Sequence, residues 1–179
     1  MSPSGRMIAV ASFQMKKCYR EIENLKTDVY VMDMDSESTG MGRGRRLVIT
    51  DGGWPSWGSD DVIFFHRGID EEHNYYIHVK WGVFQYRITT KQEIRIIPEG
   101  IDAMTPAAIC ETKVAVATLR QKHHMWSFMV PRGVEQYRHM EIFDAKDLRG
   151  PVGLTVNIRP RADHFNPFVP LQTGQSTPF

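Results

Sequence analysis

The sequence lacks the features that would send a protein into or across a membrane. No run approaches the roughly 18 apolar residues of a transmembrane helix, and the N-terminal stretch MSPSGRMIAVASF has too short an apolar segment for a signal peptide. The only two cysteines, Cys18 and Cys110, lack CxxC spacing, which predicts free and mostly buried thiols rather than a disulfide. We therefore expect a cytosolic or nuclear protein in which any membrane contact is peripheral.

An excess of charge of either sign is also missing. The 179 residues carry a formal net charge of +1, with 41% hydrophobic and 24% charged residues, which is ordinary for a soluble globular domain. Global charge therefore drives no binding to nucleic acid or lipid, and any such attraction must come from local patches. A chain of this length forms one domain with tails and buries a core without disulfides.

Recognisable catalytic and metal-binding motifs are absent. The closest approach to a phosphate loop is GMGRGRR, where Arg45 stands in the place of the third glycine of GxGxxG. His123 and His124 are adjacent and so point in different directions, and no His or Cys has the spacing of a structural zinc site. We expect no catalytic residue, metal or cofactor, although a Cys18 nucleophile with a distant histidine would leave equally little trace.

Hydrophobic periodicity predicts many short strands and one or two helices. Cys18, Ile22 and Leu25 form a short apolar stripe that indicates a helix within residues 14–26. A second helix is expected to begin at Thr105 and Pro106, which read as an N-cap followed by proline at the first helical position. Strands are expected in DVYVMDMDS, RRLVIT, VIFFHRG, KQEIRII, MWSFMV and GPVGLTVNIRP, and DGGWPSWGSDD is expected to be a turn-rich connection.

The stretch NYYIHVKWGVFQYRI, residues 74–88, has an apolar set whose phase changes near Gly82, which predicts a bulge or a turn there. The first apolar set is expected in the core: Ile77, Val79, Trp81 and Val83. The opposite face, with His78 and Lys80, is expected to contact another subunit or an anionic partner.

The absence of βαβ alternation predicts an α+β fold, with a mostly antiparallel sheet and one or two short helices packed on it. The expected organisation is an N-terminal basic segment (1–27), a single α+β core domain (28–160) and an extended tail rich in proline and aromatic residues (161–179).

Basic residues gather in three patches: MKKCYR, GRGRR and RQKHH. Clustered arginines favour phosphate, whether from RNA or from lipid headgroups. With the lysine of the central strand, the candidate anion-binding residues are Lys16, Lys17, Arg20, Arg43, Arg45, Arg46, Lys80, Arg120 and Lys122. The sequence leaves open whether they converge on one face.

Aromatic residues indicate a self-association surface. Trp54 and Trp57 lie between glycines in GGWPSWG, where the rings either dock into a partner or fold back onto the sheet. The tail retains Phe165, Phe168 and Phe179, more aromatic content than a disordered tail without a partner needs.

The order of several segments is similar to the core of rhabdovirus matrix proteins. YYIHVKWGV leads through YRITTKQEIRII to DAMTPAAIC, and then to HHMWSFMVPRG and RGPVGLTVNIRPRAD, over about residues 74–163. The lysine-rich arm and the PPxY and PTAP motifs of other members are missing, and the size resembles the small matrix proteins of plant-infecting rhabdoviruses. The resemblance implies a non-catalytic structural protein, in the virion and host cytoplasm, that associates with itself, the viral nucleocapsid and an anionic membrane surface.

Two alternatives belong to other functional classes. One is a single-stranded nucleic-acid-binding accessory protein, such as a silencing suppressor or movement-related protein, in which Tyr76, His78 and Lys80 would stack on bases and contact the backbone. The other is a small enzyme without a recognisable motif, whose mark would be a deep polar pocket with perturbed titratable groups.

Overall fold

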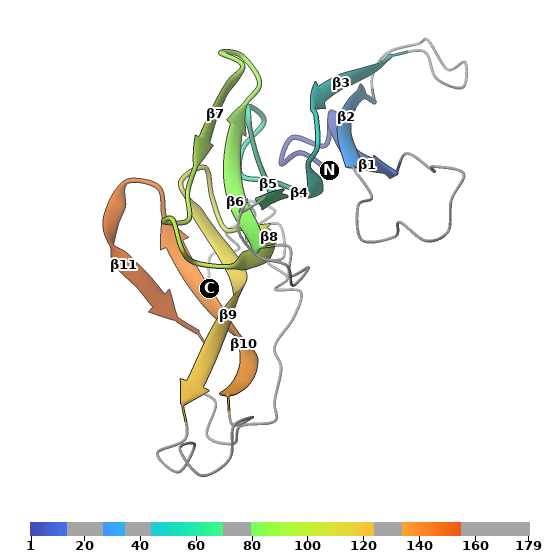
Figure 1. Cartoon of the computed structure of the whole chain (residues 1–179). Helices are drawn as coiled ribbons and strands as arrows, with labels where there is room; N and C mark the ends of the chain where they lie inside the picture. The colour runs from blue at the N-terminus through green and yellow to red at the C-terminus, as the bar shows by residue number, and fades with distance from the viewer. Residues whose placement is uncertain (14–26, 35–43, 70–79, 124–133, 155–179) are drawn as a thin grey trace, which may run out of the picture.

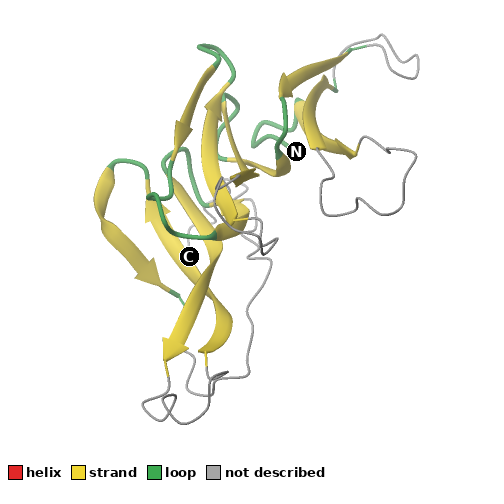
Figure 2. Cartoon of the chain, in the orientation of Figure 1, coloured by secondary structure: helices red, strands yellow, loops and turns green. Residues whose placement is uncertain are grey.

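The computed structural model describes residues 1–13, 27–34, 44–69, 80–123 and 134–154. This part of the chain contains eleven strands and no helix (Figure 2). The expected α+β class is therefore wrong: the described fold is all-β. The helix expected within residues 14–26 and the strand MWSFMV lie outside the described residues.

Three antiparallel sheets form in chain order, and each is a simple meander. Sheet A consists of β1 (Met7–Phe13), β2 (Thr27–Asp33) and β3 (Arg45–Ile49). Sheet B consists of β4 (Gly53–Trp57), β5 (Val62–Ile69), β6 (Lys80–Arg87) and β7 (Gln92–Arg95). Sheet C consists of β8 (Ala103–Ala108), β9 (Lys113–His123), β10 (Val134–Asp144) and β11 (Asp147–Gly153). Strand β1 lies within the expected N-terminal segment 1–27 and pairs with β2.

The sheets stack in the order A, B, C, with sheet B in the middle (Figure 1). The first strands of neighbouring sheets meet, β1 against β4 and β4 against β8. The blades of a β-propeller are arranged in the same way: consecutive meanders stack on one another with their first strands next to each other. The arrangement gives sheet B two covered faces and leaves sheets A and C at the ends of the stack.

Burial on both faces of sheet B explains the sequence of β6. Val83 and Gln85 are buried on one face, while Phe84 and Tyr86 pack into the cluster on the other face. The pairing of β6 with β5 runs without a break from Lys80 to Arg87. The bulge predicted at Gly82 is therefore wrong, because a strand covered on both sides carries two apolar sets rather than one that changes phase.

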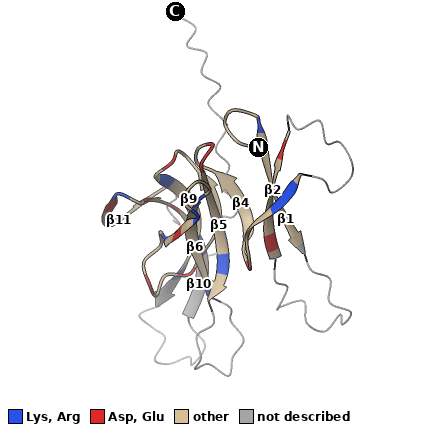
Figure 3. Cartoon of the chain, turned by 90° about the horizontal axis from the view of Figure 1, so that it is seen from above, with Lys and Arg blue, Asp and Glu red and all other residues tan. Residues whose placement is uncertain are grey.

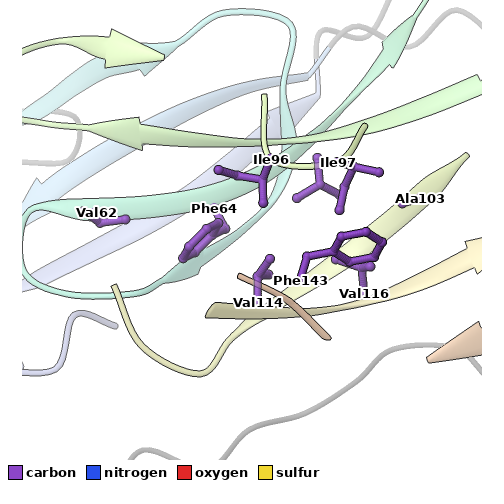
Figure 4. Packing of buried hydrophobic residues seen from close by; sticks show 9 residues of the cluster. Val62, Phe64, Ile96, Ile97, Ala103, Val114, Val116 and Phe143 are labelled. Carbon is purple, nitrogen blue, oxygen red and sulfur yellow. The ribbon is translucent and has the colours of Figure 1, made fainter. Parts of the chain in front are cut away.

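Two hydrophobic clusters fill the stack, one on each side of sheet B. Phe64 of sheet B meets residues of sheet C and of the loop before it (Figure 4). The cluster comprises Val62, Phe64, Val83, Ile96, Ile97, Ala103, Val114, Val116 and Phe143. Phe65 lies on the other face of β5 and packs toward sheet A; its cluster comprises Val29, Val31, Ile49, Trp57, Ile63 and Phe65. Val83 was expected in the core and is fully buried, whereas Ile77 and Val79 lie outside the described residues.

The helix expected at Thr105 is wrong, because this segment forms β8 in the first position of sheet C. Proline at position 106 is tolerated because β8 bulges: the pairing with β9 shifts between Met104 and Ala107, and bulges are among the few places where a sheet accepts proline. The expected connection DGGWPSWGSDD is likewise partly strand, with Gly53–Trp57 forming β4.

Within the described ranges, no helix is long and apolar enough to span a membrane. Cys110 is a free thiol as expected, but it is exposed rather than buried, because it lies on the turn between β8 and β9.

Candidate functional site

Three rings from consecutive strands of sheet B form a tryptophan–histidine cluster, which we define as Trp54, His66 and Trp81. His66 lies between the two tryptophans, with ring centroids 6.3 Å from Trp54 and 4.7 Å from Trp81. The Trp54 side of the cluster is open, since this residue is 49% exposed, whereas His66 is 8% exposed. The cluster therefore presents the Trp54 indole to the outside, next to the buried His66 ring and the half-buried Trp81 ring.

Burial keeps His66 neutral and fixes its tautomer. Desolvation lowers the pKa of His66 from 6.5 to about 4. Its Nδ1 accepts a hydrogen bond from the backbone N–H of Thr105 at 3.1 Å, so the ring proton resides on Nε2. The ring thereby links β5 of sheet B to β8 of sheet C, and its Nδ1 has no free lone pair with which to act as a base.

Backbone strain coincides with this region. Trp54 and Thr105 adopt φ values of +55° and +50°, and each precedes a proline, Pro55 or Pro106. A left-handed residue of this kind costs on the order of 1–3 kcal/mol and persists only where the surroundings determine it. The positive φ of Trp54 directs its indole away from the regular strand. In β8, the Thr105 hydroxyl is buried without a hydrogen-bond partner.

Charged groups lie beside the cluster at the start of β6. The backbone N–H of Trp81 donates to the Asp102 carboxylate at 3.2 Å, and Arg138 approaches the same carboxylate at 3.9 Å. Desolvation raises the pKa of Asp102, against the opposing effects of the Trp81 N–H, Arg138 and Lys80. Lys80, a predicted anion-binding residue, therefore lies close enough to a carboxylate for its charge to be partly offset.

The described members of the basic patches do not converge. Arg45 and Arg46 are exposed on β3 at the free edge of sheet A. Arg120 lies on β9 in sheet C, where it donates to the buried Glu141 carboxylate at 2.7 Å. Sheet B separates the two locations (Figure 1), and blue and red positions are interspersed over the sheets (Figure 3). Of these residues, Arg45 and Arg46 retain the open setting that phosphate binding needs.

Other predicted site residues lie outside the described part of the chain: Lys16, Lys17, Arg20, Arg43, Phe165, Phe168 and Phe179. The side chain of Lys122 is also outside it, and so are Tyr76 and His78 of the nucleic-acid alternative. Their assigned roles stay predictions.

The two tryptophans predicted for self-association have different environments. Trp57 is 7% exposed and belongs to the core cluster between sheets A and B, so its ring packs inside the protein. Trp54 is the outward-facing member of the pair. The difference follows from their strand, β4, in which the bulge between Gly53 and Ser56 turns the first ring outward and leaves the second in register with the core.

The outer face of sheet A, which we define as Ile8, Val10, Tyr30, Met32, Arg45 and Leu47, is a second candidate surface. The cross-strand register places Val10, Tyr30 and Leu47 in one row. Val10 is 40% and Leu47 48% exposed. The other face of the same strands packs on sheet B through Val29 and Val31, so sheet A carries apolar residues on both faces.

Sequence reasoning missed His66, Thr105 and the apolar outer face of sheet A. His66 ends the run VIFFH, in which Val62–Phe65 are buried on both faces; a histidine that continues such a run is itself a candidate for burial. Within the described ranges, no group of three His, Cys, Asp or Glu residues is arranged to hold a metal ion.

No protein-family model matches the chain, and no curated protein matches it. Among solved structures, an acylaminoacyl peptidase in complex with Z-Gly-Gly-Phe-chloromethyl ketone is similar with a TM-score of 0.55 and 10% identity, over 83% of this chain. The acylaminoacyl peptidase of Pyrococcus horikoshii is similar with a TM-score of 0.56, again at 10% identity and 83% coverage. The chain spans about a quarter (24%) of the length of each peptidase. At this identity the likeness concerns the arrangement of strands alone.

Proposed function

We propose that the protein is a non-catalytic assembly protein that associates with further copies of itself. The fuller form of the proposal is a matrix-type role, in which the assembly condenses a nucleocapsid and attaches it to an anionic membrane in the virion and host cytoplasm. The fold expected with the matrix resemblance was wrong, so the proposal rests on the surface of the molecule.

The observation that carries it is the pair of apolar faces on sheet A. A sheet that ends a stack in water normally alternates apolar and polar residues, so that one face stays solvated. Here Val29 and Val31 face sheet B, while Val10 and Leu47 are exposed on the opposite face. Contiguous exposed apolar side chains of this kind mark interaction sites.

The arginines of β3 support contact with phosphates. Arg45 and Arg46 are exposed, and Arg45 packs over the Tyr30 ring, with its guanidinium carbon 4.1 Å from the ring centroid. A guanidinium held against an aromatic ring still offers its edge to a phosphate. The affinity of such contacts for lipid headgroups or RNA should fall with added salt.

Sedimentation velocity tests the core of the proposal. We expect the wild-type protein to form larger species as its concentration rises, and to keep part of this association from about 50 mM to about 500 mM salt, because apolar contacts are not screened. In parallel, flotation with vesicles of phosphatidylserine and phosphatidylcholine should recover the protein at low salt, and pure phosphatidylcholine should not. A monomer at every concentration and salt would overturn self-association, and equal flotation with both vesicles would overturn the anionic-membrane role.

A further inference from the structure

The outer face of sheet A has a charge at each end of its apolar centre. One end carries Arg45, which shares a row with Met32 and lies over Tyr30. Strand alternation places Asp28 on the same face as Tyr30, two residues away in the opposite direction. The Asp28 carboxylate accepts the backbone N–H of Asp51 at 3.0 Å, which fixes its position. The face therefore runs from a positive end through an apolar row to a negative end.

We propose that a second copy of the chain covers this face across a two-fold axis, sheet A against sheet A. The inference rests on the proposed self-association and names the surface that performs it. A two-fold axis through the central row brings each Arg45 opposite Asp28 of the second copy, because rotation exchanges the two ends of the face. Arg45 is then covered in the dimer, and Arg46, which is exposed on the same strand, remains for phosphate contact. The same rotation places the apolar rows of Val10, Tyr30 and Leu47 against each other.

This arrangement accounts for three features at once. The apolar row loses its contact with water, which is the main favourable term in association. The two ends of the face form two opposite-charge contacts, which fix the register and disfavour a parallel arrangement that would place like charges together. The two sheets would pack as sheets A and B already do within one chain, through their apolar faces.

The size of the face sets the expected affinity. Two strands of seven residues and one of five, spaced about 4.8 Å apart, cover at most roughly 14 Å by roughly 23 Å. That area is smaller than the approximately 800 Å² per partner of a stable interface. We therefore expect a dimer with a Kd of tens of micromolar or weaker, which further contacts would have to reinforce in a larger assembly.

Sedimentation velocity with matched variants tests this surface. Leu47→Glu places a charge in the centre of the face on an edge strand, where it should weaken dimerisation at least tenfold. Ile94→Glu is the control, because Ile94 is 55% exposed but lies on β7 of sheet B, and it should dimerise like wild type. Thermal unfolding of each variant establishes that it is folded before association is compared.

A charge exchange tests the two-fold axis. Arg45→Asp and Asp28→Arg should each weaken the dimer by bringing like charges together, and the double variant should restore it. A wild-type monomer at every concentration would overturn the proposed self-association itself. Association that Leu47→Glu leaves unchanged would overturn only this surface, and loss in Leu47→Glu without rescue in the double charge variant would overturn the two-fold arrangement.

Discussion

Acid should destabilise the protein through His66. The pKa of His66 is lowered from 6.5 to about 4 by burial, so between these values the unfolded chain binds a proton that the folded chain excludes. Stability is therefore fully present above pH 6.5 and is lost as the pH falls toward 4. A lowering of this size corresponds to about 3 kcal/mol, most of which should be lost by about pH 4.5.

Urea unfolding at pH 7.5 and pH 4.5, followed by tryptophan fluorescence, measures this loss. The comparison is with His66→Gln, which removes the titrating ring and retains an oxygen able to accept the Thr105 N–H. Carboxylate contributions are common to both proteins and cancel, so wild type should lose about 2–3 kcal/mol more than the variant over this interval. Equal losses in the two proteins would refute the reasoning, as would an NMR titration of His66 with a midpoint near 6.5.

Three further predictions concern packing and backbone geometry, each measured by urea unfolding. Phe64→Ala, at a fully buried ring of the core, should cost about 3–5 kcal/mol. Gly52→Ala should cost about 1–3 kcal/mol, because its Cβ would lie 2.6 Å from a ring carbon of Phe65; Gly153→Ala, with no atom within 4 Å, is the control and should cost far less. Lys91→Gly should stabilise the protein by up to about 1 kcal/mol, because Lys91 has φ of +56° on an exposed turn; a loss of stability would contradict that reason.

Local sequence patterns predicted several of the eleven described strands and missed others, among them β1 and β10. The expected strands DVYVMDMDS, RRLVIT, VIFFHRG and KQEIRII correspond to β2, β3, β5 and β7, although β7 is shorter than its segment. These segments have strand-forming residues bounded by turn residues, so the signal is contained within each segment. Their assembly into three stacked sheets depends on contacts between distant segments, which no local pattern encodes.

The errors arose where tertiary structure overrides a local signal. Thr105 and Pro106 form a good helix start in isolation, but burial of β8 against sheet B and pairing with β9 outweigh a preference of this size. The apolar pattern changes phase at Gly82 because both faces of β6 are covered, so that both sets of alternating residues are apolar. Trp57 was predicted at a surface because glycines surround it, yet its ring packs in the core between sheets A and B. The position of Trp54, by contrast, is compatible with its predicted exposure.

The same irregularity occurs in the first strand of two consecutive sheets, and this recurrence has a physical reason. In β4 and in β8 a residue with positive φ precedes a proline, and the strand then shifts register against its neighbour. Beside these bulges, β8 is bonded to sheet B: Thr105 N–H donates to His66 on β5, and Ala108 N–H donates to Ser56 Oγ on β4 at 2.9 Å. A bulge frees backbone groups from the ladder, and here the freed groups of β8 bond to side chains of sheet B. The strain at these positions is thus offset by the contacts that fix sheet C on sheet B, and the outward position of Trp54 follows from the same geometry.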